Sequence, residues 1–369
     1  MRVLGFMSGT SLDGIDMAIL ETDGERIQAF GAAGEAPLDD GLRDQIRDAI
    51  AAGRRWERGA PEPNLFSAVG EAVARAHHAA AETFLAAHGL SFADIDLIGF
   101  HGQTVVHEAP VRGTPGRTRQ LGDGALLARL TGRPVAFDFR TADVMSGGHG
   151  APLAPIYHVA RAEASGLQPP LAILNIGGVA NITLINRSGE ITAYDTGPGN
   201  GLIDSWVEAC GLGRFDADGR LAAAGQVHED RLIEMMAHAH FGAQGPKSLD
   251  RYDFNLDTVQ GLSAEDGAAT LTAFTAEAVA RAVRPCAAAG VIVCGGGRRN
   301  PALLQQLSLR GGKPVITAER AGWRGDAIEA EAFAYLAART LKGLPISYPG
   351  TTGVGVPMSG GQVVEPGAA

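Results

Sequence analysis

The residues best suited to chemistry lie between Leu171 and Asp204, where two glycines and an aspartate follow short apolar runs. Gly177 and Gly178 separate two runs rich in β-branched residues, a pattern typical of a hairpin with a tight turn. Because glycine lets a backbone approach a ligand closely, the simplest ligand here is a phosphate. Asp195 follows a third apolar run and precedes a Pro-Gly-Asn turn and a predicted helix, a position that suits a catalytic base.

Two further glycine-rich turns also follow predicted strands. One spans residues 8–14, between apolar runs, and the other is the triplet Gly295–Gly297, ahead of a predicted helix. Together the glycine turns predict a nucleotide site, in which two hairpin turns from facing lobes hold the phosphates and the triplet holds the adenosine end. The sequence contains neither G-x-x-x-x-G-K-[ST] nor G-x-G-x-x-G.

The elements that must position these residues alternate between strands and helices, which predicts an α/β fold. The predicted strands are 2–7, 15–20, 95–100, 134–139, 171–176, 180–185, 191–194, 291–294 and 314–317. The predicted helices are 40–53, 64–89, 125–130, 202–210, a mainly helical region over 217–287, a helix that opens at 301, and 328–341. Each half of the sequence contains a predicted hairpin with a glycine-rich turn, which favours an internal duplication.

The length of 369 residues is too great for one compact core, so we expect two lobes and a tail. The N-terminal lobe, 1–145, would carry the first phosphate hairpin. The C-terminal lobe, 146–348, would carry the second phosphate hairpin, the catalytic aspartate and the adenosine turn. Residues 349–369, rich in glycine and proline, would form an irregular C-terminal tail.

Composition narrows the class of protein. The net charge of −10, without a basic stripe, argues against a nucleic-acid partner. Three scattered cysteines are too few for a disulfide framework or a zinc site. We expect a cytoplasmic protein with no membrane partner, because the sequence shows no signal peptide and no apolar run near the ~20 residues that span a bilayer.

Several segments, in order along the chain, resemble motifs of the anhydro-N-acetylmuramic acid kinase family. They are Met7–Asp16 (MSGTSLDGID), His101–Thr104 (HGQT), Asp138–Arg140 (DFR), Gly150–Leu153 (GAPL), Asn175–Asn181 (NIGGVAN), Asp195–Asn200 (DTGPGN) and Glu329–Ala334 (EAEAFA). The resemblance implies the two-lobed fold of actin, hexokinase and acetate kinase, with ATP in the cleft between the lobes.

The reaction that the resemblance implies combines hydrolysis with phosphorylation. Water opens the 1,6-anhydro ring of anhydro-N-acetylmuramic acid while the γ-phosphoryl group of ATP passes to O6. The products are ADP and N-acetylmuramic acid 6-phosphate, an intermediate of peptidoglycan recycling. Cleaving the anhydro bond requires a carboxylate near C1 to deprotonate water, as in inverting glycosidases. Asp195 matches the family's base, and we expect Glu329 to orient the same water or a sugar hydroxyl.

The glycine turns and the resemblance together assign the remaining site residues. The residues expected to bind ATP, with Mg²⁺, are Gly9, Thr10, Ser11, Leu12, Asp13, Gly14, Ile15, Asp16, Asn175, Gly177, Gly178, Gly295, Gly296, Gly297, Arg298 and Asn300. The residues expected to bind the sugar are His101, Gln103, Asp138, Arg140 and Asp143. We assign no protein ligand to the metal, because Met7 and Asn175 stand where many members of the superfamily carry aspartate.

Each assignment has a plainer alternative. Asp195 could only cap its turn, His101 could be a core histidine, the 138–143 cluster could be structural, and Glu329 could face solvent. Two other functions also stay open. One is a different small-molecule kinase of the same fold, and the other is a nucleotide-switched interaction protein. The expected partner is a small-molecule sugar, and a homodimer is left open.

Overall fold

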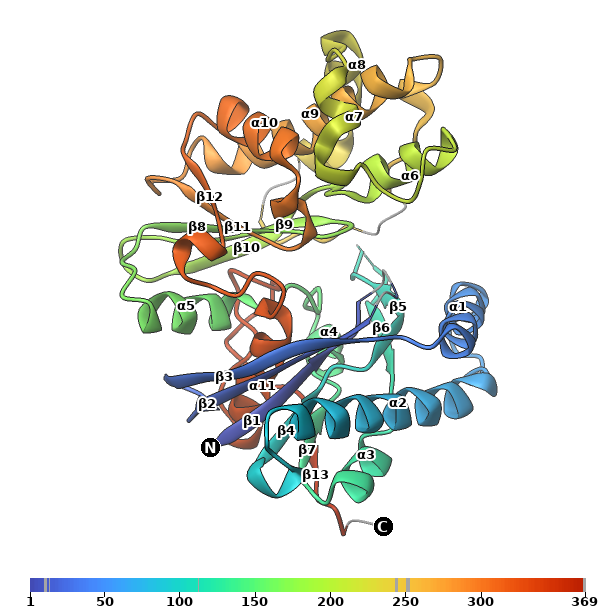
Figure 1. Ribbon diagram of the computed structural model, residues 1–369, viewed down its shortest axis with the longest axis vertical. Helices are drawn as coiled ribbons and strands as arrows, with labels where there is room; N and C mark the ends of the chain where they lie inside the picture. Colours follow the sequence, from blue (N-terminus) through green and yellow to red (C-terminus); the bar gives the residue numbers. More distant parts are fainter. Residues whose placement is uncertain (10–11, 13, 112, 243–244, 250–252, 368–369) are drawn as a thin grey trace. The chain divides into compact units, whose positions relative to one another are not determined.

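The computed structural model describes residues 1–9, 12, 14–111, 113–242, 245–249 and 253–367. The chain divides into two compact units, one made of residues 1–166 and 327–369 and the other of residues 167–326 (Figure 1). The predicted α/β class and the division into two parts are confirmed. The boundaries differ from those expected at 145 and 348, because two helices assigned to the second lobe pack in the first unit.

The first unit is built on a mixed sheet with strand order β13-β7-β4-β1-β2-β3 (Figure 1). Its strands are β1 (Arg2–Met7), β2 (Gly14–Thr22), β3 (Ile27–Pro37), β4 (Leu97–Phe100), β7 (Val135–Phe137) and β13 (Gln362–Val364). β1, β2 and β3 are antiparallel neighbours, whereas β4 runs parallel to β1, and β7 parallel to β4. The tail is therefore not irregular throughout, since β13 pairs antiparallel with β7.

Helices cover both faces of this sheet. Successive side chains of β1 point to opposite faces, so each face has residues that pack against helices. Leu4 and Phe6 pack into the core formed with α1 (Asp40–Arg55), α2 (Leu65–Ala87) and α3 (Gly124–Thr131) (Figure 1). The opposite face receives α11 (Ile328–Leu341). A Cβ at Gly5 would collide with the backbone of Ala330, and one at Gly99, its partner on β4, with that of Phe333. This glycine pair lets α11 lie directly on the strands.

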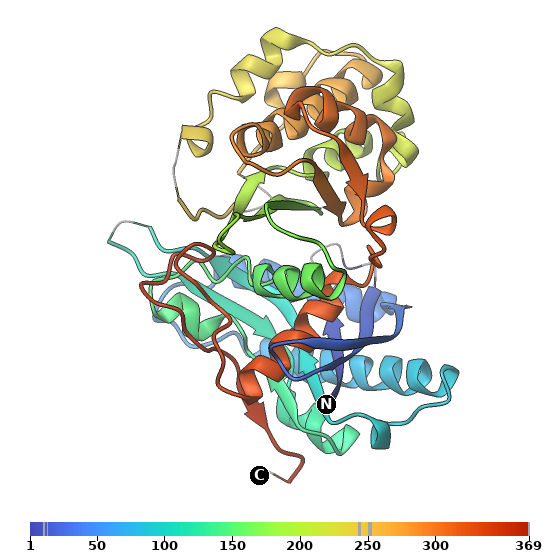
Figure 2. The ribbon, with the colours of Figure 1, turned by 90° about the vertical axis from the view of Figure 1, so that its left-hand side faces the viewer.

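α5 (Pro155–Ala164) lies beside α11 in the first unit (Figure 2). The Tyr157 hydroxyl donates to the buried Glu331 carboxylate, and Arg161 Nε lies 3.8 Å from Glu331 Oε2. Breaking a buried ion pair leaves an uncompensated charge, so these contacts tie α5 to α11. They explain why residues 146–166 and 327–348 belong to the first unit.

The second unit repeats the strand pattern of the first. Its sheet has the order β10-β9-β8-β11-β12, with β8 (Leu171–Ile176), β9 (Ala180–Ile185), β10 (Ile191–Gly197), β11 (Val291–Cys294) and β12 (Val315–Thr317). As in the first unit, three antiparallel strands in chain order are followed, beside the first of them, by two parallel strands. This shared topology supports the duplication predicted from the two hairpins, and it gives their turns equivalent places.

Helices of the second unit form two apolar clusters. α9 (Ala264–Val283) and α10 (Pro301–Gly311) pack against the sheet. The other cluster joins α9 to α6 (Gly201–Ala209), α7 (Arg220–Ala224) and α8 (Glu229–Met235). Ser263 caps α9 by accepting from Asp266 N at 3.0 Å.

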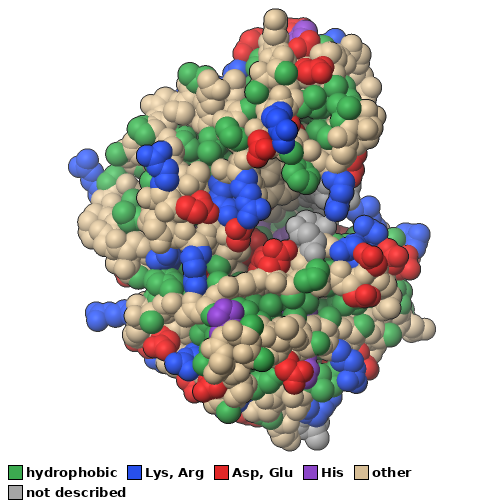
Figure 3. Space-filling model, in the orientation of Figure 1, with side chains coloured by type: hydrophobic (Ala, Val, Ile, Leu, Met, Phe, Trp, Pro, Cys, Tyr) green, Lys and Arg blue, Asp and Glu red, His purple; other side chains and the backbone are tan. Residues whose placement is uncertain are grey.

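The remaining elements are short, and those outside the predicted helical region 217–287 were not predicted. They are the hairpin β5 (Gln103–Glu108) and β6 (Arg117–Leu121), the helix α4 (Thr141–Met145), and the 3₁₀ turns Phe92–Asp94, Ala217–Gly219, Ala239–Gly242, Asp257–Val259, Gly296–Arg299 and Glu319–Ala321. No helix in the described ranges has the length and apolar character to cross a bilayer. On the face drawn in Figure 3, acidic and basic side chains are interspersed.

Candidate functional site

The loop that follows β10 closes against the turn of the second hairpin. Asn200 N donates to Gly177 O at 2.8 Å, and Gly201 N donates to Gly178 O at 3.0 Å. The Asn200 side chain adds a bond from Nδ2 to Ile176 O at 3.4 Å. The structure therefore brings together two segments that the sequence assigned separately, the glycine pair and the Asp-Thr-Gly-Pro-Gly-Asn loop.

The glycine triplet after β11 lies against the same corner of the sheet. Gly295 has a φ of +72°, and a Cβ there would meet the Asn175 side chain and would lie 2.6 Å from Ile176 O. A Cβ at Gly297 would lie 2.6 Å from Ile176 Cγ2. Glycine at these two positions is thus required by the protein's own packing.

The glycine pair of the hairpin turn is different. A Cβ at Gly178 would have no neighbour within 4 Å, and one at Gly177 would approach nothing closer than Val179 O at 3.8 Å. Neither residue adopts the left-handed conformation that favours glycine. Folding does not require glycine here, so the open space beside the turn fits a ligand that approaches the backbone.

Arg298 and Asn300 have structural partners within the second unit. Arg298 donates to Glu319 Oε1 at 2.7 Å and to Gly295 O at 2.9 Å, and its Nη2 lies 2.7 Å from Asp326 Oδ2. Asn300 is the N-cap of α10, with Oδ1 accepting from Leu303 N at 3.0 Å. These contacts fix the glycine triplet and the start of α10.

Asp195 is held from several sides by the segment 240–249, of which residues 243–244 lie outside the described part. Asp195 N donates to Lys247 O at 3.0 Å, and the side chain accepts from Leu249 N through Oδ2 at 2.8 Å. His240 Nε2 donates to Asp195 O at 2.9 Å. The carboxylate of Asp195, only 8% exposed as a residue, therefore has a fixed position.

Sequence reasoning missed this support for Asp195. Burial, reinforced by the nearby Lys247 ammonium, lowers the pKa of His240 to about 4, so the ring is neutral at pH 7. Lys247 Nζ in turn donates to His240 O at 2.8 Å. Residues 245–248 contain a proline and do not match a phosphate loop, and nothing in their spacing points to Asp195.

The turn between β1 and β2 in the first unit is anchored to the segment that follows β4. Gln103 Nε2 donates to Gly9 O at 3.3 Å, and Ser8 Oγ donates to Gly102 O at 3.4 Å. Gln103 Oε1 is buried and has no hydrogen-bond partner among the described residues. The structure thus joins the predicted phosphate turn to the predicted sugar segment. The Gln103 amide oxygen remains available to accept a hydrogen bond at this junction.

Of the other residues assigned to this turn, the structure describes some and leaves others outside the described part. Ile15 is buried and Asp16 half-buried in β2, and Gly14 is confined because a Cβ would lie 2.7 Å from Glu35 Oε1. Predictions for Thr10, Ser11 and Asp13 lie outside the described residues.

His101 and Arg140 form a pair. Arg140 Nε donates to His101 Nε2 at 3.1 Å, and His101 Nδ1 donates to Gly102 O at 2.7 Å. Burial, together with the Arg140 charge, holds the pKa of His101 well below its ordinary value. The imidazole is therefore neutral with its proton on Nδ1, and Arg140 Nη1 also donates to Gly150 O at 2.7 Å.

Asp143 is buried and bonded within the protein. Its Oδ1 accepts from Gly150 N at 2.6 Å, and its Oδ2 accepts from Thr352 Oγ1 at 2.5 Å. The carboxylate therefore links the glycine-rich loop 147–150 to the C-terminal segment. This geometry gives Asp143 a supporting place behind Arg140.

A cavity of about 340 Å³ opens beside His101 and Asp138 in the first unit. It is lined by Phe100, His101, Gly102, Thr118, Arg119, Gln120, Leu121, Gly122, Phe137, Asp138, Thr141 and Gln362. Asp138, with a φ of +55°, accepts from Thr141 Oγ1 at 2.5 Å and from Gln362 Nε2 at 3.0 Å. Gln120 Oε1 is buried there without a partner among the described residues. Gln120 and Gln362 carry no motif, so the sequence did not reveal them.

The two residues assigned to catalysis belong to different units. Asp195 lies in the second unit, and Glu329 lies half-buried in the first turn of α11 in the first. Within the described residues, no group of three or more His, Cys, Asp or Glu side chains could hold a metal ion. Mg²⁺ in kinases is held largely by substrate phosphates and water, with few protein ligands, so this donor set fits an ion carried by ATP.

The chain is similar to a family model, to named relatives and, distantly, to solved structures. A family model described as anhydro-N-acetylmuramic acid kinase matches residues 1–366. A protein of that name from Caulobacter vibrioides is 62% identical over 366 residues, which cover 99% of each chain. Another from Phenylobacterium zucineum is 59% identical over 368 residues, covering 99% of this chain and 100% of the relative. A solved structure of a ROK family glucokinase from Streptomyces griseus, in complex with glucose and AMPPNP, matches with a TM-score of 0.39 and 14% identity over 92% of this chain and 100% of that one.

Proposed function

The chain belongs to the anhydro-N-acetylmuramic acid kinase family, and from this premise we propose that it phosphorylates anhydro-N-acetylmuramic acid with ATP while opening its ring. The products are N-acetylmuramic acid 6-phosphate and ADP, and the reaction serves peptidoglycan recycling in the cytoplasm. The observation that carries the proposal is the fixed Asp195 carboxylate on β10, a strand whose following loop closes on a hairpin turn with glycines that face open space.

The proposed reaction balances with one base. Water attacks C1, its proton passes to the Asp195 carboxylate, and the C1–O6 bond breaks. The electron pair left on O6 attacks the γ-phosphorus, and the bond from that phosphorus to ADP breaks. Because the phosphoryl group takes up the developing charge on O6, no general acid is required. A general base contributes about 10²–10⁴-fold, and positioning and charge neutralisation supply the rest.

For ATP, we propose that the phosphates approach the open turn at Gly177 and Gly178 and the topologically equivalent 8–14 turn. The Gly177 N–H donates to Val179 O at 3.1 Å, so other backbone N–H groups of these turns would donate to the phosphates. The triplet 295–297, placed by Arg298 and Asn300, would bind the adenosine end. The proposed metal is Mg²⁺, which would neutralise the phosphate charge and be held mainly by phosphate oxygens and water.

For the sugar, we propose contacts from the first unit. Gln103 Oε1, which has no partner in the described part of the chain, would accept a hydrogen bond from the substrate, because leaving a buried acceptor unpaired costs about 1–3 kcal/mol. His101 and Asp138, which line the cavity, would contact the sugar together with Arg140. Asp143 would act indirectly by holding the loop behind Arg140, and Glu329 would orient the water or a sugar hydroxyl.

The test is an assay of ADP formation with Mg-ATP and a panel of sugars that includes the anhydro sugar, ordinary N-acetylmuramic acid and a hexose. We expect turnover with the anhydro sugar and a product with the mass of N-acetylmuramic acid 6-phosphate. Faster turnover with a different sugar would assign another kinase activity, and slow ATP hydrolysis that no sugar changes would contradict the proposal.

A further inference from the structure

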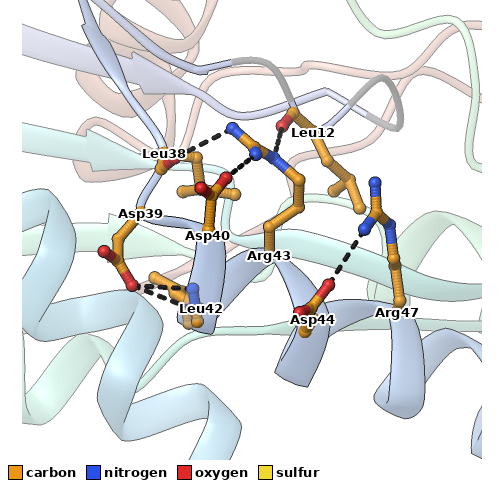
Figure 4. Close-up of polar contacts among 9 residues, drawn as sticks. Leu12, Leu38, Asp39, Asp40, Leu42, Arg43, Asp44 and Arg47 are labelled. Carbon is orange, nitrogen blue, oxygen red and sulfur yellow. Dashed lines mark hydrogen bonds and ion pairs between the residues drawn. The ribbon is translucent and has the colours of Figure 1, made fainter.

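Two arginines on α1 look alike in the sequence but differ in their surroundings (Figure 4). Each pairs with an aspartate three residues earlier, Arg43 with Asp40 and Arg47 with Asp44 at 2.9 Å. Such pairs on a helix surface contribute little. The Arg43 side chain, however, is only 24% exposed, whereas that of Arg47 is 60% exposed.

Arg43 reaches the turn between β1 and β2. Its Nε donates to Leu12 O at 2.8 Å, and its Nη2 donates to Leu38 O at 2.9 Å. The guanidinium therefore joins the described end of the turn to the segment that links β3 to α1 (Figure 4). Among the residues that the structure describes, Arg47 has a polar contact with Asp44 alone.

Leu12 has an unusual backbone. Its φ of +57° lies in the left-handed region, which leucine seldom adopts. Its side chain is buried, its N–H donates to Gly9 O at 3.3 Å, and its carbonyl accepts from Arg43. A conformation of this kind persists only where its surroundings hold it, and the Arg43 hydrogen bond is one of the contacts that hold it.

We propose that Arg43 is a positioning residue for the ATP site, because it fixes the Leu12 carbonyl within the first hairpin turn, which is proposed to bind phosphate. This inference rests on the proposed function of that turn. Arginine suits the task because its rigid fork donates to two carbonyls and to the Asp40 carboxylate at once. A lysine ammonium has no such fork, so it keeps the charge without spanning both carbonyls.

The test compares Arg43→Ala, Arg43→Lys and the matched control Arg47→Ala in the full chain. The affinity for AMPPNP with Mg²⁺ is measured by calorimetry, and the KM values for ATP and for the anhydro sugar are measured separately. Loss of one charge-assisted hydrogen bond predicts about tenfold weaker nucleotide binding in Arg43→Ala. For Arg43→Ala we expect an unchanged KM for the sugar. Arg43→Lys should recover part of the nucleotide affinity, and Arg47→Ala should keep the wild-type nucleotide affinity and KM values.

Nucleotide affinity of Arg43→Ala within twofold of Arg47→Ala would overturn the inference. A parallel loss of nucleotide affinity, sugar affinity and melting temperature would also overturn it, because that result indicates general damage. If Arg43→Ala does not fold, Arg43→Lys decides, and unchanged nucleotide affinity in that variant refutes the role. A wild-type chain that binds no nucleotide would instead overturn the proposed function.

Discussion

Gly178 and Gly295 both follow strands of the second sheet, yet alanine should act differently at the two positions. At Gly295 it should lower the stability of the fold, whereas at Gly178 it should weaken nucleotide binding and leave stability nearly unchanged. At Gly295, with φ +72° and ψ 178°, alanine must adopt a backbone conformation that is essentially restricted to glycine, which costs about 1–3 kcal/mol, and its Cβ would crowd Asn175 and Ile176. Together these effects predict a loss of roughly 2–4 kcal/mol, or about 5–10 °C in melting temperature.

At Gly178, a Cβ meets nothing within 4 Å, so Gly178→Ala should change the unfolding free energy by no more than about 0.5 kcal/mol. If the phosphates of ATP approach this turn, however, the new methyl group occupies space that they need. We expect at least a tenfold weaker affinity for AMPPNP with Mg²⁺, which corresponds to about 1.4 kcal/mol.

Thermal unfolding and calorimetric titration of both variants separate the two effects. Gly295→Ala serves as the control for a glycine whose necessity is structural. A Gly178→Ala protein that melts like the wild type and binds the nucleotide equally well would refute the view that this turn contacts the phosphates. A large drop in the melting temperature of Gly178→Ala would show that the space beside Gly178 is not open.

Three further predictions concern the base, its surroundings and pH. Asp195→Asn should lose about 10³-fold in turnover while nucleotide affinity stays, and near-normal turnover would remove Asp195 from its role. Asp143→Ala should cost about 2 kcal/mol of unfolding free energy by leaving Gly150 N unpaired, and Asp143→Asn, which keeps an acceptor, should recover most of it in denaturant titrations. Burial lowers the pKa of His77 from 6.5 to about 4. The unfolded chain therefore binds a proton at this position that the folded chain excludes between these values, so His77 alone should lower stability by roughly 3 kcal/mol as pH drops from 6.5 to 4. His77→Leu should make that dependence shallower, and an unchanged slope would contradict the argument.

Local sequence signals predicted the elements next to the candidate site. Both hairpins follow from apolar runs separated by glycine-containing turns, and the bounds of α11 follow from its apolar pattern. The start of α10 follows from Asn300 and Pro301, a cap and a first-turn proline. These features depend on neighbouring residues, which a single sequence displays.

Features that depend on distant partners were not predictable. β3 is largely half-exposed and rich in alanine and glycine, so it lacks a strand pattern. β13 spans only Gln362–Val364 and forms because β7, far away in the sequence, offers an edge. The unit boundary at residue 326 likewise reflects the packing of α11 on the first sheet.

The same limit applies to the site. The sequence places Asp195 after a strand but gives no sign that Lys247 and Leu249 lie against it. Arg43 looks like a surface ion pair on a helix until its bond to the left-handed Leu12 is seen. Residues that support a site from elsewhere in the chain carry no motif of their own.

The central claim, that ring opening by water is coupled to phosphorylation, is tested most directly by isotope incorporation. The chain is incubated with Mg-ATP and anhydro-N-acetylmuramic acid in heavy-oxygen water, and the sugar phosphate is analysed by mass spectrometry before the anomeric oxygen can exchange. The proposed function predicts one solvent oxygen at C1 and the phosphoryl group on O6. A sugar phosphate that keeps the anhydro ring, or that carries no solvent oxygen at C1, would contradict it.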